Sequence, residues 1–191
     1  MKRVVVVALL AVTLPMAARA SSIDFANQGG TVTGSEAAGL TLSSTLTGVI
    51  GLSGGPIAGT NLGTVVLQTG ALTGGSFAAG GTLGAGTITI TGNGSSGIPT
   101  GTLFSGTFST ATWASLGTLA DGTHAFLLTA VLSGGSGTTF QGVVDMGNGF
   151  TGIGTITSGD TSVVVPEPGT LGLLGTGLLG IAGLVRRKLT V

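Results

Sequence analysis

Apolar residues alternate with threonine and serine along several stretches of this 191-residue chain. Over residues 40–52 the even positions are mostly leucine or isoleucine, and the odd positions are mostly threonine or serine. Residues 87–91 alternate between threonine and isoleucine, and Gly92-Asn93-Gly94, a sequence typical of a hairpin turn, follows them. A period of two places apolar side chains on one face of a β-strand. The pattern therefore predicts a chain built of strands.

Further strands are predicted wherever apolar runs lie between glycine-rich turns, at residues 62–69, 101–107, 108–116, 124–132, 140–146 and 150–157. Threonine favours strands and abundant glycine disfavours helices, so the composition agrees with the pattern. We expect an all-β, antiparallel β-sandwich of about eight to ten strands. A β-solenoid is the alternative, although the sequence shows no fixed repeat of the length that solenoids use.

The distribution of charge limits what the central region can bind. All six Lys and Arg lie outside residues 21–165, whereas Asp24, Glu36, Asp121, Asp145 and Asp160 lie within them, so the formal charge there is 0 − 5 = −5. Nucleic-acid binding needs cations to neutralise phosphates, so it is excluded, and recognition of phosphate or anionic lipid is disfavoured. The chain has no cysteine and therefore no disulfide, thiol nucleophile or thiolate ligand.

Hydroxyl groups must supply most of the polar surface of this region, which contains 33 Gly, 27 Thr and 16 Ser. Many of these hydroxyls are expected to face solvent. The alternation predicts that Thr41, Ser43, Thr45 and Thr47 share one face of a strand, and that Thr87, Thr89 and Thr91 share one face of another. Stability must come from apolar burial and backbone hydrogen bonds, because pairs of Asp or Glu with Lys or Arg cannot form within residues 21–165.

His124 is the single imidazole of the chain, and Asp121 or Asp145 could complete a Ser-His-Asp arrangement with it. No Gly-x-Ser-x-Gly elbow occurs in a suitable setting, however. The favoured interpretation is that His124 begins a strand, so no catalytic residue is predicted.

The segment Asp145-Met146-Gly147-Asn148-Gly149 has two oxygen-bearing side chains among glycines and resembles part of a Ca²⁺ loop. It lacks the third carboxylate and the closing Glu of an EF-hand loop. A strand end and a tight turn explain it better, so no metal and no cofactor are predicted.

Trp113 is the one tryptophan, beside seven phenylalanines. Its indole could stack on a sugar ring, which makes it the candidate sugar contact of the sequence. A position in the core or half-buried at its edge is the favoured interpretation.

The N-terminal segment has the three parts of a secretory signal peptide. Lys2 and Arg3 are followed by the apolar run 4–14 and then by Ala18-Arg19-Ala20, a small-x-small cleavage signature. We expect the Sec translocon to export the chain and signal peptidase to cut between Ala20 and Ser21, which makes residues 1–20 a signal peptide. A retained N-terminal anchor is the alternative.

The C-terminal segment combines a short polar motif, an apolar stretch and a basic stop. Pro166-Glu167-Pro168 precedes 17 uncharged residues, 169–185, and Arg186, Arg187 and Lys188 follow. As a helix the uncharged stretch would span about 25 Å, which is slightly less than the roughly 30 Å of a bilayer core. The basic residues would keep the C-terminus in the cytoplasm. The sequence predicts a marginal, transient anchor in the inner membrane.

This tail, residues 166–191, resembles the PEP-CTERM sorting signal of Gram-negative bacteria, on the evidence of Pro166-Glu167-Pro168, the apolar stretch and the closing Arg186-Arg187-Lys188. The resemblance implies recognition by an exosortase, a membrane protease-transpeptidase that cuts near the tripeptide. It also implies a bacterium that makes exopolysaccharide. An ordinary C-terminal anchor is the alternative, but it leaves the tripeptide unexplained.

Three classes of function remain for residues 21–165. They are a structural protein of the cell surface or of an exopolysaccharide or biofilm matrix, a secreted carbohydrate-active enzyme, and a sugar-binding module. Acid–base and nucleophilic catalysis need titratable groups that this region scarcely has. The sequence therefore favours the structural protein and no enzymatic activity.

Overall fold

The computed structural model describes residues 21–52, 55–145 and 150–165. These residues form a single 11-stranded sheet and two short 3-10 turns. The strands are β1 (Ser21–Ser35), β2 (Gly39–Ile50), β3 (Ile57–Gln68), β4 (Leu72–Ser76), β5 (Gly80–Leu83), β6 (Gly86–Asn93), β7 (Thr100–Phe108), β8 (Ala111–Thr118), β9 (His124–Leu132), β10 (Gly137–Asp145) and β11 (Ile153–Val165). The turns are η2 (Ser95–Gly97) and η3 (Ser133–Gly135).

The order of strands across the sheet is β4-β5-β8-β9-β10-β11-β1-β2-β3-β6-β7. Every pairing whose register the structure defines is antiparallel. The prediction of an antiparallel all-β domain is confirmed. The arrangement in two separate sheets is corrected, because the strands form one continuous sheet, and antiparallel pairing also removes the solenoid alternative.

The first and last strands are neighbours in the middle of this sheet. The backbone N–H of Gly34, near the end of β1, donates to the carbonyl of Gly152, just before β11, at 2.8 Å. We call β1, β2, β3, β6 and β7 the first half of the sheet and the remaining strands the second half. The β1–β11 seam therefore joins two halves that come from different parts of the chain.

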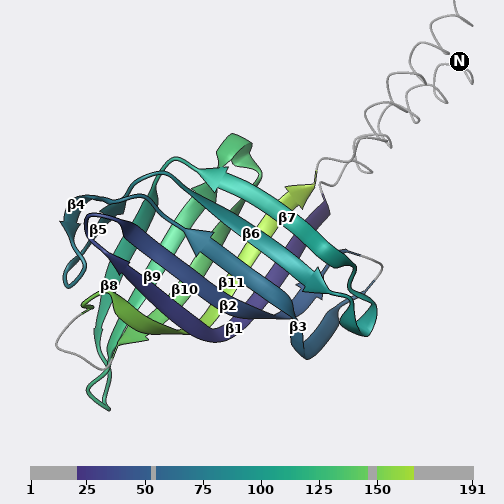
Figure 1. Ribbon diagram of the computed structural model, residues 1–191, viewed down its shortest axis with the longest axis horizontal. Coiled ribbons are helices and arrows are strands. Elements are labelled where there is room, and N and C mark those ends of the chain that lie inside the picture. The colour runs from purple at the N-terminus through teal and green to yellow at the C-terminus, as the bar shows by residue number, and fades with distance from the viewer. Residues whose placement is uncertain (1–20, 53–54, 146–149, 166–191) are drawn as a thin grey trace, which may run out of the picture. The chain divides into compact units, whose positions relative to one another are not determined.

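The sheet curls so that its two halves enclose one core (Figure 1). In Figure 1, β6 and β7 cross in front of the strands of the second half, and β7 contacts β9. Phe104 of β7 stacks on Phe25 of β1, with ring centroids 6.4 Å apart. Apolar side chains fill the space between the halves because alternate residues of each strand point inward, as the buried Leu40, Leu42 and Leu46 of β2 show.

An aromatic cluster forms part of the core on the side of the second half. The rings of Phe77, Trp113, Phe126 and Phe150 contact one another, with centroid separations of 4.9 to 6.3 Å. The indole N–H of Trp113 donates to the carbonyl oxygen of Phe77 at 2.9 Å. The one polar atom of the indole is therefore satisfied in the core, as a buried donor requires.

A buried polar ladder crosses the β1–β11 seam. Asn27 of β1 and Gln141 of β10 exchange two amide hydrogen bonds, of 2.8 and 3.2 Å, and Asn27 also donates to Ser44 of β2 at 2.8 Å. Gln141 donates to the Thr139 hydroxyl at 3.1 Å, which in turn pairs with Thr161 at 2.9 Å. Each of these five side chains is less than a tenth exposed. The ladder therefore supplies partners to polar groups that would otherwise be costly to bury.

Candidate functional site: an uncharged hydroxyl face

The outer surface of the first half is an ordered array of hydroxyl-bearing side chains. Antiparallel register aligns residues of five strands into three rows that run across the sheet. The rows are Gln28, Thr45, Thr64, Thr91 and Thr102; Thr31, Ser43, Val66, Thr89 and Ser105; and Thr33, Thr41, Gln68, Thr87 and Thr107. We call these 15 positions, 12 of which are Thr or Ser, the hydroxyl face. All of them are exposed or half-buried, and none carries a charge.

The geometry of the hydroxyl face follows from that of a sheet. Neighbouring strands lie about 4.8 Å apart and alternate residues of one strand about 6.7 Å apart, so the five strands present hydroxyls over an area of roughly 20 by 13 Å. At the centre of one row, the hydroxyls of Thr64 and Thr91 lie 2.7 Å apart and share a hydrogen bond. Such a surface offers many weak hydrogen bonds and no electric field that would select a charged ligand.

The sequence located two strands of this array. Thr41, Ser43 and Thr45 share the outer face of β2, and Thr87, Thr89 and Thr91 share that of β6, as the alternation predicts. Thr47 differs, because the register shifts between Leu46 and Gly48, and the Thr47 hydroxyl donates to the carbonyl of Ala26 at 3.3 Å. Sequence reasoning missed the contributions of β1, β3 and β7, because a single sequence does not show which strands become neighbours.

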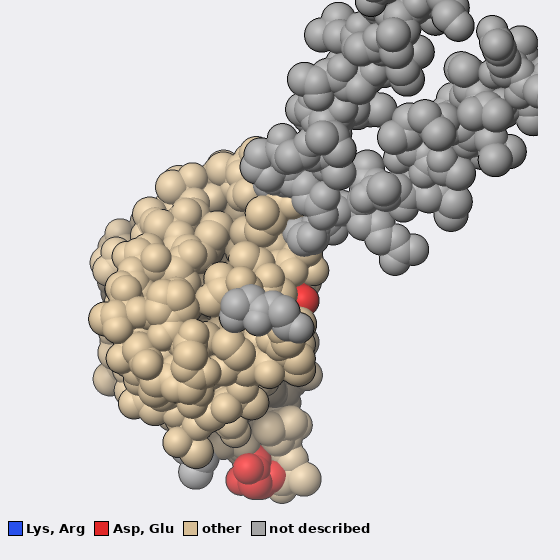
Figure 2. Space-filling view, turned by 90° about the vertical axis from the view of Figure 1, so that its right-hand side faces the viewer, with Lys and Arg blue, Asp and Glu red and all other residues tan. Residues whose placement is uncertain are grey.

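Charged side chains are absent from the whole stretch between Glu36 and Asp121. This stretch includes the strands from β2 to β8, so four of the five strands of the hydroxyl face come from it. The face of the molecule drawn in Figure 2 is largely tan, with acidic residues at two places. Of the acids, Asp24 lies on β1, the remaining strand of the hydroxyl face, but outside its three rows, and the others lie on β10 and β11 and in the turns after β1 and β8.

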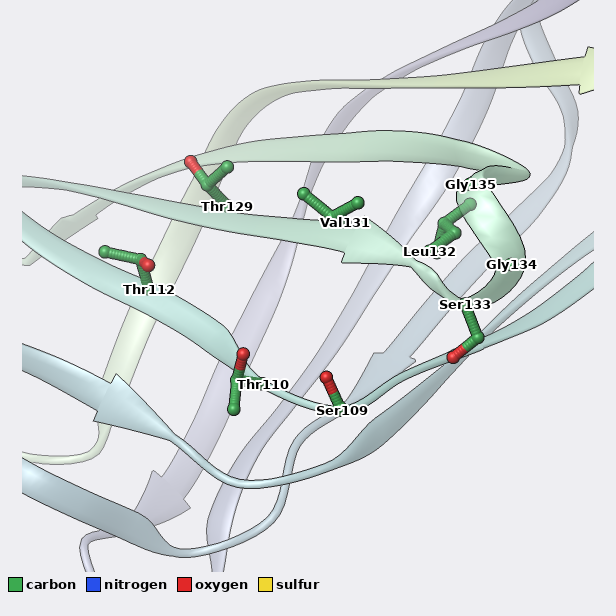
Figure 3. A pocket seen from close by; sticks show the side chains of 9 residues that line it. All are labelled: Ser109, Thr110, Thr112, Thr129, Val131, Leu132, Ser133, Gly134 and Gly135. Carbon is green, nitrogen blue, oxygen red and sulfur yellow. The ribbon is translucent and has the colours of Figure 1, made fainter.

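A surface pocket of about 370 Å³ lies on the second half, between the β7–β8 connection and the end of β9 (Figure 3). The hydroxyl-bearing residues Ser109, Thr110, Thr112, Thr129 and Ser133 line it, together with Val131, Leu132, Gly134 and Gly135. No titratable side chain is among them. The pocket can therefore bind through hydroxyls and aliphatic surface, but its lining offers no general acid or base.

The structure places Trp113 in the core, the position that the sequence favoured over a sugar contact. Its side chain is 1 % exposed, and its indole stacks on Phe126 at a centroid separation of 4.9 Å. No face of the ring is available to a sugar. Trp113 is therefore a core residue, and the candidate sugar contact does not lie there.

The structure brings His124 close to one of its two candidate carboxylates. His124 lies directly opposite Asp145 on β10, and Thr118 lies opposite His124 on β8, with the hydroxyl 3.4 Å from Nδ1. The row thus contains a hydroxyl, an imidazole and a carboxylate, but the hydroxyl belongs to threonine and the contact is long for a hydrogen bond. This geometry gives the Thr118 hydroxyl little activation as a nucleophile.

Asp121 has a local role instead. Its carboxylate accepts hydrogen bonds from the hydroxyl and from the backbone N–H of Thr123, in the turn before β9. The two bonds hold the pKa of Asp121 below its ordinary value, the hydroxyl bond having the larger effect. A carboxylate used in this way stabilises a turn and is not directed at His124.

The pKa of Asp160 on β11 is raised. Partial burial is the larger cause and the negative charge of Asp24 on the neighbouring β1 is the smaller one. Within the described ranges 21–52, 55–145 and 150–165, no three His, Asp or Glu side chains gather in a way that could hold a metal ion. Of the loop that resembles part of a Ca²⁺ site, residues 146–149 lie outside the described part of the chain.

The predicted processing signals also lie outside it. Ser21, the predicted mature N-terminus, is the first residue of β1. Ala18, Ala20, Pro166-Glu167-Pro168, the apolar stretch 169–185 and the basic residues 186–188 are not among the described residues. Within the described ranges, no helix has the length and hydropathy needed to cross a membrane.

Comparison with known proteins identifies the C-terminal segment. Residues 164–188 match the model of the PEP-CTERM protein-sorting motif, so the match begins at the last two residues of β11. No curated protein and no solved structure matches the chain. The motif marks an exported protein that an exosortase recognises and processes. The chain is therefore one of the proteins that carry a PEP-CTERM sorting motif.

Proposed function

We propose that this protein is a non-enzymatic component of the cell surface or extracellular matrix of a Gram-negative bacterium, and that it associates with neutral exopolysaccharide through the hydroxyl face. The hydroxyl face is the observation that carries the proposal. Of its 15 uncharged positions, 12 carry hydroxyls and two carry glutamine amides, so 14 offer hydrogen-bond donors and acceptors in three rows across five strands. Polysaccharide hydroxyls are complementary to such a surface, because each can both donate and accept.

Charge supports a neutral ligand over an acidic one. Residues 21–165 carry five acids and no Lys or Arg, so a polymer rich in uronic acid would be repelled and would find no cation to pair with. The twist of a β-sheet, about 20–25° per strand, also disfavours a flat crystalline surface as the ligand. A flexible polysaccharide chain can follow the twisted rows.

The route to that location follows from the two ends of the chain. The signal peptide, residues 1–20, would direct export, and the segment 169–185 would hold the protein briefly in the inner membrane. An exosortase would then cut near Pro166-Glu167-Pro168 and release the domain. Changing Glu167 to Ala is expected to leave export intact and to stop the release, which the intact mass in the native host would show.

Affinity electrophoresis tests the proposed contact. The purified domain, residues 21–165, has its own core and is run through gels that contain dextran, glucomannan or alginate. We expect retardation by at least one of the neutral polymers and none by alginate. A variant with Thr45, Thr64 and Thr91 changed to Val loses three of the four hydroxyls of one row at constant charge and nearly constant shape, and its retardation should fall several-fold.

The control changes three exposed threonines outside the hydroxyl face, Thr82, Thr118 and Thr155, to Val. This variant loses the same number of hydroxyls and should be retarded like the unaltered domain. Equal loss in both variants, or no retardation by any neutral polymer, would overturn the proposal. Hydrolysis of a polysaccharide by the domain, abolished by replacing His124 or Asp145, would establish the enzyme instead.

A further inference from the structure

The outer surface of the second half contains the one aromatic side chain that is exposed. The chain has seven Phe, one Trp and no Tyr, and the described residues include all eight aromatic side chains. Six of these are buried and Phe104 is half-buried, whereas Phe140 on β10 is 45 % exposed. Phe140 is therefore the aromatic ring of the described residues that a ligand could contact at the surface.

Register surrounds Phe140 with polar side chains. Phe140 lies opposite Thr129 of β9 on one side and opposite Asp160 of β11 on the other. Thr129 in turn lies opposite Thr112 of β8. Directly opposed side chains have Cβ atoms about 4.5–5.5 Å apart, so the row Thr112, Thr129, Phe140, Asp160 is continuous.

Two residues of this row also line the surface pocket described above. Thr112 and Thr129 are two of its lining residues, and Figure 3 shows them on neighbouring strands, with Thr110, Ser109 and Ser133 nearby. Val131, on the same face of β9 as Thr129, adds aliphatic surface and is 62 % exposed. A ring placed over Phe140 would therefore border a pocket that contains five hydroxyls and no charge.

We propose that Phe140 and this pocket form a saccharide subsite for a neutral hexose unit. The apolar face of the sugar ring would stack on Phe140, the Asp160 carboxylate and the Thr129 hydroxyl would bind ring hydroxyls, and the neighbouring unit would enter the pocket. The inference rests on the proposed function in taking a neutral saccharide as the ligand. It concerns a different surface, so it can fail separately.

The chemistry of the subsite selects this ligand over others. A purely aliphatic partner would leave the pocket hydroxyls without hydrogen bonds when water is excluded, which is unfavourable for each buried group. A uronate would face Asp160 with a like charge and find no cation in residues 21–165. A neutral hexose has one apolar face and several hydroxyls, which matches a ring flanked by Thr129 and Asp160.

NMR titration of the labelled domain, residues 21–165, with cellohexaose, maltohexaose, mannohexaose and trigalacturonate tests the subsite. We expect the Phe140 ring and Thr129 methyl signals to shift when at least one neutral hexaose is added. Trigalacturonate should leave both signals in place. Phe140→Ala should weaken that binding at least tenfold, and Phe140→Trp should retain it. The matched control is Ile153→Ala, which removes another exposed apolar side chain, 70 % exposed on β11, and should leave binding unchanged.

The outcomes separate this subsite from the hydroxyl face. If no hexaose shifts these signals while neutral polysaccharide still retards the domain, the subsite is wrong and the proposed function stands. Equal loss in the Phe140→Ala and Ile153→Ala variants would also overturn the subsite. If Phe140→Ala instead abolishes concentration-dependent association in sedimentation, with hexaose binding unaltered, Phe140 contacts a second copy of the chain and the proposal fails.

Discussion

The two halves of the sheet differ in the side chains that they bury and in those that they expose. The interior of the first half is mainly aliphatic, although β1 and β2 contribute Asn27 and Ser44 to the polar ladder, and its outer face is rich in hydroxyls. The second half contributes the aromatic cluster and part of the polar ladder to the interior, whereas its outer face includes Phe140 and Val131. The first half is therefore mostly apolar inside and polar outside, whereas the second half has both kinds of side chain on each face.

This difference shows which half is a regular surface and which is specialised. Aliphatic side chains and threonine suit a pleated sheet without depending on any one partner, so the first half distributes its stability over many residues. In the second half a few side chains have several specific partners each, as Trp113 and Gln141 do. We therefore expect the second half to be the more sensitive to single substitutions.

The largest expected effect is that of Trp113→Ala. It removes the ring that contacts three other aromatics and leaves the Phe77 carbonyl without its donor, so we expect unfolding to become easier by about 3–5 kcal/mol. The comparison is Leu67→Ala in the first half, at a similar 1 % exposure, with an expected cost of about 2–4 kcal/mol. Urea unfolding followed by circular dichroism measures both losses. A larger loss of unfolding free energy for Leu67→Ala than for Trp113→Ala would contradict the comparison.

Gly159→Ala tests the seam between the halves. A Cβ at Gly159 would lie 2.0 Å from Oε1 of Gln141 and 2.6 Å from Nδ2 of Asn27, so the amide pair must separate. Two buried amides that lose their partners should cost about 1–3 kcal/mol each in the free energy of unfolding.

Gly74→Ala on β4 is the control for this substitution, because nothing lies within 4 Å of its Cβ position. It should change stability by less than about 0.5 kcal/mol. If the two alanines have equal effects in urea unfolding, steric contact with the polar ladder is not what requires glycine at position 159.

Two threonine substitutions of identical chemistry separate the ladder from the hydroxyl face. Thr139→Val removes a fully buried hydroxyl bonded to Thr161 and Gln141, and should cost about 1–2 kcal/mol. Thr89→Val removes a hydroxyl of the outer face and should cost less than about 0.5 kcal/mol. Thermal unfolding of both variants measures the difference, and equal losses would show that the face hydroxyls also stabilise the fold.

The sequence predicted most strands because their alternation is regular. For β9 the predicted and observed bounds, 124–132, coincide. β1 was missed because bulges shift its register between Ala26 and Asn27 and between Gln28 and Thr31, which breaks the period of two. The short strands β4 and β5 were missed because glycine occupies four of their nine positions, so they lack the apolar pattern.

The candidate sites depended on information that a single sequence does not hold. The alternation showed that Thr41 and Thr89 face outward, but the rows of the hydroxyl face exist because β2, β3 and β6 are neighbours in one register. Likewise Phe140 has the same residue type as buried Phe126, and its position in β10 relative to the core decides its exposure. The sequence shows which residues of a strand share a face, but it does not show which strands are neighbours in the sheet.

The smallest expected effect concerns the acids at the seam. The pKa of Asp160 is raised in the folded state by burial and by the charge of Asp24, so its ionised form is disfavoured there. The group therefore stabilises the fold below the pKa of the unfolded chain, and this contribution is lost as the pH rises through the folded pKa. Because the carboxyl group is largely in solvent, Asp160→Asn should raise stability at pH 7 by only a few tenths of a kcal/mol, and the gain should shrink in high salt.

Asp121→Asn is the comparison of opposite sign for this titration. The pKa of Asp121 is lowered by its bonds to Thr123, so its contribution is present above the unfolded pKa and is lost as the pH falls through the folded pKa. This variant should be less stable than the unaltered domain at pH 7, and the difference should vanish on acidification. As the pH is raised from about 3 to 7, the melting temperature relative to the unaltered domain should therefore rise for Asp160→Asn and fall for Asp121→Asn. A decrease for Asp160→Asn at pH 7 would show that Asp160 is a net stabilising group, and that the seam where the halves meet tolerates both of its charges.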